Sequence, residues 1–404
     1  MGGLSGHMCH VHEDNALTFG EVKAILHLAS KGKLASVTEK LDGQNTFFTF
    51  NPLLGLRFAR NGGHIKTGGI DAYDINIRWA DKPLVAEAFA KAYKVLSIAL
   101  DALSASDRQV IFNNGTIWYS AEIIGRINPN VIRYDGDAVV FHESGTVYDD
   151  NGKPLDIDTG SNFASLINNV NRMQNAILET GWQVMGPVST QLTKLANIQL
   201  LDSALTALNS FMFQWDMDNE DTLNDAFLEY LIAEHLLDLT ADDDTKLYVA
   251  ELVSDFENTL TSKKPYLTSL IEQGSLNKDQ YKLITDLIKN GPNLYTRFVE
   301  PVRDTIREFS VGMLHDMQSC LITNSVQEVQ RLRMVVETAI EQIELLRTDR
   351  EKDMLKKELG RLKDLSNISS SMEGIVFKYS DKVYKFTGAF APVNQILGLE
   401  KYGR

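Results

Sequence analysis

The sequence predicts an α+β fold in which an antiparallel sheet domain is split by a long all-α insertion. Residues 35–147 contain short runs rich in aromatic and branched residues, separated by Gly, Asn and Pro, a texture typical of antiparallel strands. Residues 161–365 show apolar residues at helical spacing. Strand-like sequence returns at residues 371–388. We therefore expect the last strands to complete the sheet that the first part of the chain begins.

The chain is expected to enter this sheet domain through one helix. Residues 9–33 hold apolar side chains at helical spacing, namely Phe19, Val22, Ile25 and Leu26. Residues 1–8 end on a second Met, and we expect them to be a remnant of protein expression outside the fold.

The sheet domain is expected to comprise residues 9–150 and 368–404. Its first strands are predicted at Thr46–Phe50, Leu56–Ala59, Thr116–Ile124 and Ala138–Phe141. An apolar helix over residues 82–107 interrupts these strands.

The helical insertion is expected over residues 151–367, after a turn-rich boundary at 149–160. Its residues 182–187 read as a break between helices. Its last helix begins with Ser325 and Glu328 in the spacing of a capping box, in which both side chains satisfy free backbone N–H groups. The apolar stripe that follows predicts a helix packed antiparallel in a bundle. A dimeric coiled coil is the alternative.

Composition is that of an ordinary globular protein. The 404 residues are 44% hydrophobic and 23% charged, and no apolar run approaches the roughly 20 residues that a membrane span needs. There is no secretory signal pattern. Cys9 and Cys320 are the only cysteines, too few for a disulfide framework, which favours a reducing compartment. We expect a cytoplasmic protein with no membrane partner, in the host cytoplasm if a phage encodes it.

The formal net charge of −14 is concentrated in one segment. Residues 216–257 contain fourteen acidic residues and one basic residue, so the remainder of the chain is nearly neutral. This excludes a protein that coats nucleic acid but leaves room for a local basic groove. The acidic segment itself reads as a solvated helical surface, with a nucleic-acid mimic or a partner site as alternatives.

Two short motifs far apart in the sequence carry the functional prediction. The first, Lys40-Leu41-Asp42-Gly43-Gln44-Asn45, combines an amine with a carboxylate and a glycine that permits close approach of a ligand. A lysine amine that attacks the α-phosphate of ATP forms a phosphoramidate, from which AMP can be passed onward. The second motif runs from Glu373 to Lys378. Taken alone, the first motif could be an exposed turn between two strands.

These residues resemble motifs of the covalent nucleotidyltransferases, the superfamily of ATP-dependent DNA ligases, RNA ligases and mRNA capping enzymes. Residues 39–45 resemble motif I in the form found in RNA ligase 2-like enzymes. Residues 371–378 resemble motif IV, and residues 384–388 resemble motif V, as in ligase-like proteins of large tailed bacteriophages. The resemblance implies an ATP-grasp-like ligase domain. Only nineteen residues follow Lys385, so we expect no C-terminal OB-fold, which RNA ligase 2-like enzymes also lack.

The resemblance implies a role for each matching residue. Lys40 is the expected nucleophile, and the expected nucleotide-binding residues are Glu39, Asp42, Gly43, Asn45, Arg60, Glu122 and Phe141. Glu122 matches the carboxylate of motif III that binds ribose, although Ala121 replaces the usual glycine before it. Phe141 matches the aromatic residue that stacks on the base, with a place in the core as the alternative. Arg60 is expected to grip a phosphate or end group.

The resemblance also implies a metal and two cationic residues. Glu373 and Asp42 are expected to hold Mg²⁺, for which Mn²⁺ can substitute, partly through water. Lys378 and Lys385 are expected to neutralise the α-phosphate in the transition state. Thr387 stands where motif V carries a second lysine.

The implied function is an ATP-dependent polynucleotide ligase, and an RNA ligase is favoured over a DNA ligase. Lys40 would first bind AMP covalently. The AMP would then pass to a 5′-phosphate end, and a 3′-hydroxyl would displace it and seal the strand. One alternative is a nucleotidyltransferase with a cap, protein or small molecule as acceptor. Another is a catalytically weak ligase-fold module for binding or assembly. Partners are then nucleic acid ends, while the helical insertion would bind a protein or self-associate.

Overall fold

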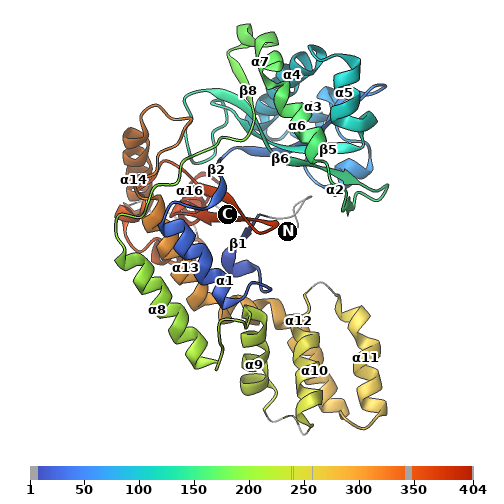
Figure 1. The fold of residues 1–404 in the computed structure, drawn as a ribbon, viewed down its shortest axis with the longest axis vertical. Coiled ribbons are helices and arrows are strands. Elements are labelled where there is room, and N and C mark those ends of the chain that lie inside the picture. Colours follow the sequence, from blue (N-terminus) through green and yellow to red (C-terminus); the bar gives the residue numbers. More distant parts are fainter. Residues whose placement is uncertain (1–7, 238, 240, 257, 342–347, 403–404) are drawn as a thin grey trace. The chain divides into compact units, whose positions relative to one another are not determined.

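The protein is mixed α/β with open, mainly antiparallel sheets in a computed structural model (Figure 1), so the broad fold class is confirmed. The structure describes residues 8–402 except 238, 240, 257 and 342–347; most of the predicted expression remnant therefore lies outside the described residues. The chain forms two compact units. One contains Ala35–Thr193 and Leu314–Arg404, and the other contains Cys9–Leu34 and Lys194–Met313.

This division cuts the predicted helical insertion into three parts. Residues 151–193 and 314–367 belong to the unit that carries the sheets, and only 194–313 belong to the other unit, together with the first helix. The predicted break between helices at residues 182–187 is confirmed, but it is not a simple turn. It contains strand β8 (Trp182–Met185), which pairs parallel with β6, because Trp182 and Val184 are apolar and reach the buried core.

The larger sheet has the strand order β4-β3-β5-β6-β7, with β8 attached to β6. Its strands are β3 (Gln44–Asn51), β4 (Gly55–Ala59), β5 (Ile117–Ile124), β6 (Asp137–Tyr148) and β7 (Pro154–Leu155). Helices cover one face of this sheet (Figure 1), namely α4 (Pro83–Asp101), α5 (Ala105–Phe112), α6 (Gly160–Asn168) and α7 (Val170–Ala176). Two short helices, α2 (Gly62–Lys66) and α3 (Ala72–Arg78), follow β4.

Strand alternation explains why one face of this sheet is buried. Phe48, Tyr119, Ile123, Val139 and Phe141 all belong to the cluster beneath the helices. In a strand, neighbouring residues point to opposite faces, so the residues between these hydrophobic positions face the other way. The opposite face carries the polar side chains of the larger sheet, between apolar residues that are also buried.

A second sheet contains the strands β10 (Lys382–Thr387), β9 (Gly374–Tyr379) and β2 (Ala35–Lys40), in that order and all antiparallel. The prediction that the last strands join the first part of the chain is confirmed by the pairing of β9 with β2. The expectation of one continuous sheet is wrong, because the chain leaves β2 at Leu41 and starts β3 in the larger sheet at Gln44.

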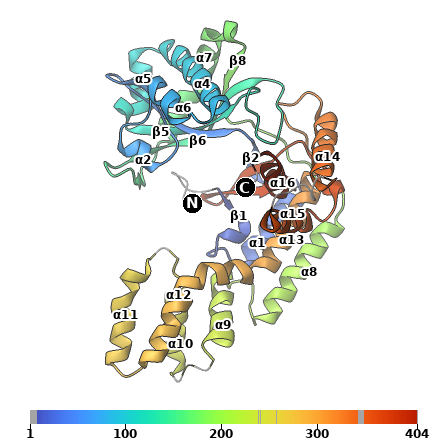
Figure 2. The ribbon, with the colours of Figure 1, turned by 180° about the vertical axis from the view of Figure 1, so that it is seen from behind.

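Three helices complete this unit: α14 (Ser325–Glu341), α15 (Asp349–Leu362) and α16 (Phe390–Tyr402). They share one hydrophobic cluster, and Figure 2 shows α15 beside α16. The predicted capping box of α14 is wrong by one residue. Asn324 accepts the hydrogen bond from the N–H of Gln327, while Glu328 turns toward another segment of the chain.

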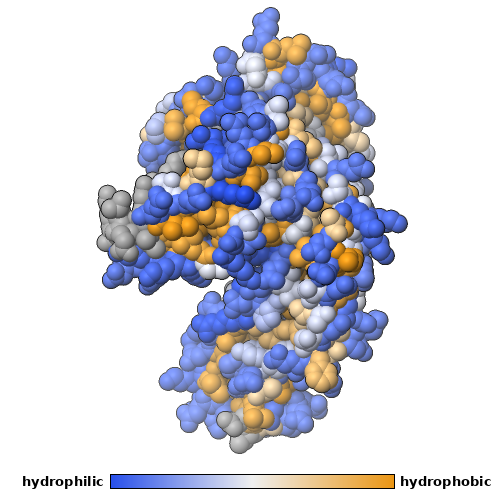
Figure 3. Space-filling model, turned by 90° about the vertical axis from the view of Figure 1, so that its left-hand side faces the viewer, coloured by the Kyte–Doolittle hydropathy of each residue, from blue (hydrophilic) through white to orange (hydrophobic). Residues whose placement is uncertain are grey.

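The other unit is mainly helical and has its own aromatic core around Phe227 and Phe298. Its elements are β1 (Cys9–His10), α1 (Phe19–Ser30), α8 (Gln199–Gln214), α9 (Leu223–His235), α10 (Asp243–Ser254), α11 (Leu260–Glu272), α12 (Lys278–Phe298) and α13 (Glu300–Leu314). None of the described helices is both long and apolar enough to cross a membrane. On the face in Figure 3, hydrophobic residues form several groups among hydrophilic ones.

Candidate active site

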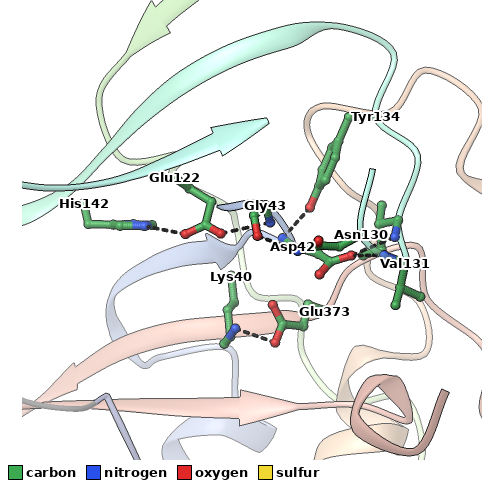
Figure 4. Close-up of polar contacts among 10 residues, drawn as sticks. Lys40, Asp42, Gly43, Glu122, Asn130, Val131, Tyr134, His142 and Glu373 are labelled. Carbon is green, nitrogen blue, oxygen red and sulfur yellow. Dashed lines mark hydrogen bonds and ion pairs between the residues drawn. The ribbon is translucent and has the colours of Figure 1, made fainter. Parts of the chain in front are cut away.

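The two motifs predicted to act together meet in the structure. Lys40 ends β2, and Glu373 immediately precedes β9. The ammonium group of Lys40 forms an ion pair with the Glu373 carboxylate, and both side chains are largely buried (Figure 4). The register places Lys40 opposite Gly374, the first residue of β9, and Glu373, just before the strand, turns toward Lys40.

The same register places the other two predicted lysines on the sheet face of Lys40. Lys385 lies opposite Val376, and Lys378 follows Val376 by two residues on β9. Residues directly opposite one another project from the same face, and the faces alternate along each strand. Lys40, Lys385 and Lys378 therefore project from one face, with Lys385 one step and Lys378 two steps away from Lys40 along β9.

Thr387 also projects from this face. It lies opposite Gly374, which in turn lies opposite Lys40. Thr387, where motif V would carry a second lysine, therefore lies level with Lys40 across the strands. Ala121, the other departure from the family pattern, is fully buried in the core beneath the helices.

The face of the larger sheet opposite α4 to α7 contributes a group of polar residues. Asn45 lies opposite Glu122 on β5, and Glu122 lies opposite Val140 on β6. His142, two residues beyond Val140, has its Nε2 atom 3.3 Å from Oε2 of Glu122. The amide of Asn45 donates to the hydroxyl of Ser120 at 3.2 Å. This polar group lies between two apolar clusters of the same unit.

Gly43 allows the turn between the two sheets to lie against β5. Its N–H donates to Oε1 of Glu122 at 3.0 Å. A Cβ atom at Gly43 would come within 2.6 Å of the carbonyl oxygen of Ile123 and 2.7 Å of Cγ of Glu122. The backbone oxygen cannot give way as a flexible side chain would, so only glycine fits here.

Asp42 points away from Lys40 and into the loop that follows β5 (Figure 4). Its Oδ2 accepts hydrogen bonds from the N–H groups of Val131 at 2.7 Å and Ile132 at 2.8 Å. Its own N–H donates to the hydroxyl of Tyr134. Burial raises the pKa of Asp42 to about 6 even though these hydrogen bonds oppose the shift. In this arrangement Asp42 holds the loop instead of making the predicted sugar or metal contact.

The electrostatics of the site favour a protonated Lys40. Burial lowers the pKa of Lys40, but the carboxylates of Glu373, Glu122 and Asp42 outweigh it, and the pKa is raised above its ordinary value. Burial raises the pKa of Glu373 to about 7, although the ammonium group of Lys40 opposes this shift. Glu373 is the carboxylate with the largest effect on Lys40, so positive charge brought to Glu373 would lower the pKa of Lys40 again.

Glu39 lies on the opposite face of β2 from Lys40. Its carboxylate accepts hydrogen bonds from the hydroxyl of Ser319 at 2.6 Å and from the N–H of Cys320 at 2.8 Å. The side chain is buried, which raises its pKa. Glu39 therefore anchors β2 to the segment before α14, and the structure does not bring it to the other predicted nucleotide-binding residues.

Phe141 is a core residue, so its predicted role in stacking on the base is wrong. It is fully buried, and its ring stacks on Phe48 with ring centroids 5.1 Å apart. The physical reason is strand alternation, which directs Phe141 to the helix-covered face and its neighbour His142 to the polar face. Alternation along residues 138–142 was the one signal in the sequence that could have identified His142.

Arg60 lies just beyond β4 and reaches back to the first motif. Its guanidinium donates to the carbonyl oxygen of Asn45 at 2.6 Å and lies over the ring of Phe89 at 5.4 Å. Burial lowers the pKa of Arg60, and the nearby Glu122 carboxylate opposes this effect. Arg60 thus belongs to the same polar group as Asn45 and Glu122.

A cavity of about 310 Å³ borders the first motif. Its wall includes Asp42 and Gly43 together with Arg126, Asn130 and Arg133 of the loop after β5. Neither Asn130 nor Tyr134 was predicted as a site residue, because only the folded chain brings this loop to the motif.

Within the part of the chain that the structure describes, no group of three or more His, Cys, Asp or Glu residues is placed to hold a metal ion. Glu373 is the acidic residue beside Lys40 that can offer a carboxylate. Mg²⁺ keeps several waters and uses one or two carboxylates together with substrate phosphates. Glu373 could therefore serve as one ligand of Mg²⁺ whose other ligands are water and phosphate oxygens.

Comparisons of the chain with protein-family models, with curated proteins and with solved structures find no match.

Proposed function

We propose that the protein is an ATP-dependent polynucleotide ligase that acts through a covalent Lys40–AMP intermediate. The observation that carries the proposal is the pairing of Lys40 with Glu373, on a sheet face that also presents Lys385 and Lys378. In this proposal the two sheets form an ATP-grasp-like nucleotidyltransferase domain, and the nucleotide binds between Lys40 and the polar group around Glu122.

The first step needs the neutral amine of Lys40. In the ligand-free site this amine is an ammonium group held by Glu373. Mg²⁺ bound with ATP would supply positive charge at Glu373 and at the phosphates. The raised pKa of Lys40 then falls, because Glu373 no longer stabilises the ammonium form, and the proton is released to water.

The neutral nitrogen of Lys40 attacks the α-phosphorus of ATP. A nitrogen–phosphorus bond forms, the bond from the α-phosphorus to the bridging oxygen breaks, and pyrophosphate leaves. Lys385 and Lys378 lie on the same sheet face and neutralise charge that develops on the phosphate oxygens. Glu122 accepts hydrogen bonds from the ribose, and the ring of His142 takes the place beside the base that was predicted for Phe141.

The second and third steps use a polynucleotide. AMP passes from Lys40 to a 5′-phosphate, and a 3′-hydroxyl then attacks that phosphate and displaces AMP. The form of the first motif, with Asn45 after Gln44, favours RNA over DNA ends. Transfer of AMP to another acceptor would require the same Lys40 chemistry and differs only after the first step.

The test is to incubate the protein with α-labelled ATP and Mg²⁺, denature it and measure the label that remains bound. The proposal predicts acid-labile labelling of the wild type and none of Lys40→Arg, which keeps the positive charge. Gel assays with nicked RNA, DNA and hybrid duplexes then report sealing. Absence of label with every nucleoside triphosphate would overturn the proposal, and label without sealing would indicate another acceptor.

A further inference from the structure

The 130–134 loop forms hydrogen bonds to the middle of the first motif. The backbone N–H groups of Val131 and Ile132 bind the Asp42 carboxylate, and the hydroxyl of Tyr134 accepts from the Asp42 N–H at 2.8 Å. Asp42 is only 7% exposed. A buried carboxylate is costly unless it is hydrogen bonded, so the position of these two N–H groups decides where Asp42 can lie.

Asn130 extends the contact to the next two residues of the motif. Its side-chain amide donates to the carbonyl oxygen of Gly43, and its Oδ1 accepts from the amide of Gln44 at 2.7 Å. Together with the contacts of Asp42, these hydrogen bonds join the 130–134 loop to Asp42, Gly43 and Gln44. The loop therefore fixes the conformation of the turn that follows β2, the strand that ends at Lys40.

Helix α14 binds the same loop from its other side. Oε1 of Glu328 accepts from the N–H of Arg133 at 2.9 Å, and Nη2 of Arg331 donates to the carbonyl oxygen of Val131. Glu328 and Arg331 also pair with each other through two hydrogen bonds, at 2.6 and 2.8 Å. Val131 is thus held at both ends of its backbone, by Asp42 through its N–H and by Arg331 through its carbonyl.

The burial of Glu328 argues for a geometric role. Glu328 is 7% exposed, and a buried ion pair contributes little stability compared with well-packed hydrophobic residues. The pair instead orients the loop. Glu328 accepts a hydrogen bond from Arg133, and Arg331 donates one to Val131, two residues earlier.

We propose that Glu328 and Arg331 are positioning residues for Lys40, which act through the 130–134 loop and Asp42. The inference depends on the proposed function of Lys40 as nucleophile. When the pair is lost, the loop no longer fixes the Asp42–Gly43 turn, and the Lys40 nitrogen loses its alignment with the α-phosphorus. A misplacement of about 1 Å costs roughly 100-fold in rate.

The chain offers a matched control in helix α15. Glu358 pairs with Arg361 at the same spacing of three residues and at 2.6 Å, and Glu358 is 8% exposed. Among the described contacts, Glu358 makes no hydrogen bond to the 130–134 loop. Glu358→Ala therefore removes a comparable buried pair without touching the proposed connection to Lys40.

The experiment compares Glu328→Ala, Glu328→Gln and Glu358→Ala in the full chain. It measures the rate of Lys40–AMP formation against ATP concentration, together with thermal melting. We expect Glu328→Ala to lower the maximal rate roughly 10- to 100-fold with little change in KM. Glu328→Gln keeps an acceptor for Arg133 and recovers most of the rate. Glu358→Ala lowers the melting temperature to a similar extent but leaves the rate within about twofold.

The inference is overturned if Glu328→Ala and Glu358→Ala slow the reaction equally, or if the rates follow the melting temperatures. Hydrogen exchange of the backbone amides of Asp42, Gly43, Val131 and Ile132 gives a readout that needs no reaction. We expect faster exchange there in Glu328→Ala only. If the wild type forms no adduct, the proposed function fails, while the exchange data still decide whether α14 fixes the motif.

Discussion

Lys40 and Glu373 form an ion pair although they belong to opposite ends of the chain. Strand register brings the two residues near each other, because β2 and β9 run antiparallel with Lys40 opposite Gly374, and Glu373 precedes β9. A shift of this register by one residue would turn Lys40 to the other face of the sheet. The proposed chemistry therefore depends on the pairing of β2 with β9, two strands from opposite ends of the chain.

Replacement of Glu373 by Gln should lower the pKa of Lys40. The carboxylate of Glu373 is the strongest of the influences that raise this pKa, and Glu122 is weaker. The neutral amine is then reached at a lower pH. We expect faster modification of Lys40 by an amine-reactive reagent in Glu373→Gln at neutral pH, and a smaller increase in Glu122→Gln. Equal reactivity of Lys40 in all three proteins would contradict the electrostatic account.

Replacement of Asp42 by Asn should change how stability depends on pH. The folded protein raises the pKa of Asp42 from 3.8 to about 6, so it binds this proton more tightly than the unfolded chain does. The resulting stabilisation is complete below the unfolded pKa and is lost as pH rises through about 6, a change of about 3 kcal/mol. Denaturant unfolding between pH 4 and 7 should show a flatter profile for Asp42→Asn. Parallel profiles would show that Asp42 does not carry this shift.

Gly43→Ala should destabilise the protein and abolish nucleotide transfer. The new Cβ would overlap the Ile123 carbonyl, and such overpacking costs about 1–3 kcal/mol. Gly136→Ala is the control, because a Cβ at Gly136 meets nothing within 4 Å. Unfolding midpoints and adduct formation should separate the two variants. If Gly43→Ala behaves like Gly136→Ala, the close approach to β5 is not important.

Phe141 and His142 should respond in opposite ways to replacement by Ala. Phe141→Ala removes a fully buried ring and should cost about 3–5 kcal/mol of unfolding free energy. His142→Ala should cost about 1 kcal/mol or less but raise the KM for ATP roughly tenfold, as loss of base stacking does. A raised KM with Phe141→Leu and an unchanged KM with His142→Ala would reverse the assignment.

Local patterns predicted the parts of the site that depend on residue type. Short motifs with strand-like flanking sequence were enough to identify Lys40, Gly43 and Glu373. Helix α4 and strands β3 to β6 followed from apolar spacing in the same way. Phe141 and His142 show where this approach stops, because motif matching identifies an aromatic position but only pairing and burial decide which face it occupies.

Outside the two matched motifs, three contacts between distant segments could not be predicted. Asp42 binds the 130–134 loop, Glu39 binds Ser319, and Glu328 binds Arg133, and none of these pairs has a periodic or local signature. Strand β8 was missed for a related reason. Its four residues are too few for a pattern, and they become a strand only by pairing with β6.

The most direct test of the account is to find where AMP is attached after the protein reacts with ATP and Mg²⁺. Mass spectrometry of the intact protein, followed by peptide mapping under conditions that preserve phosphoramidates, locates the modification. The account predicts the added mass of one AMP on Lys40, and no addition in Lys40→Arg. An unmodified Lys40 in folded wild-type protein, or AMP attached to a different residue, would contradict it.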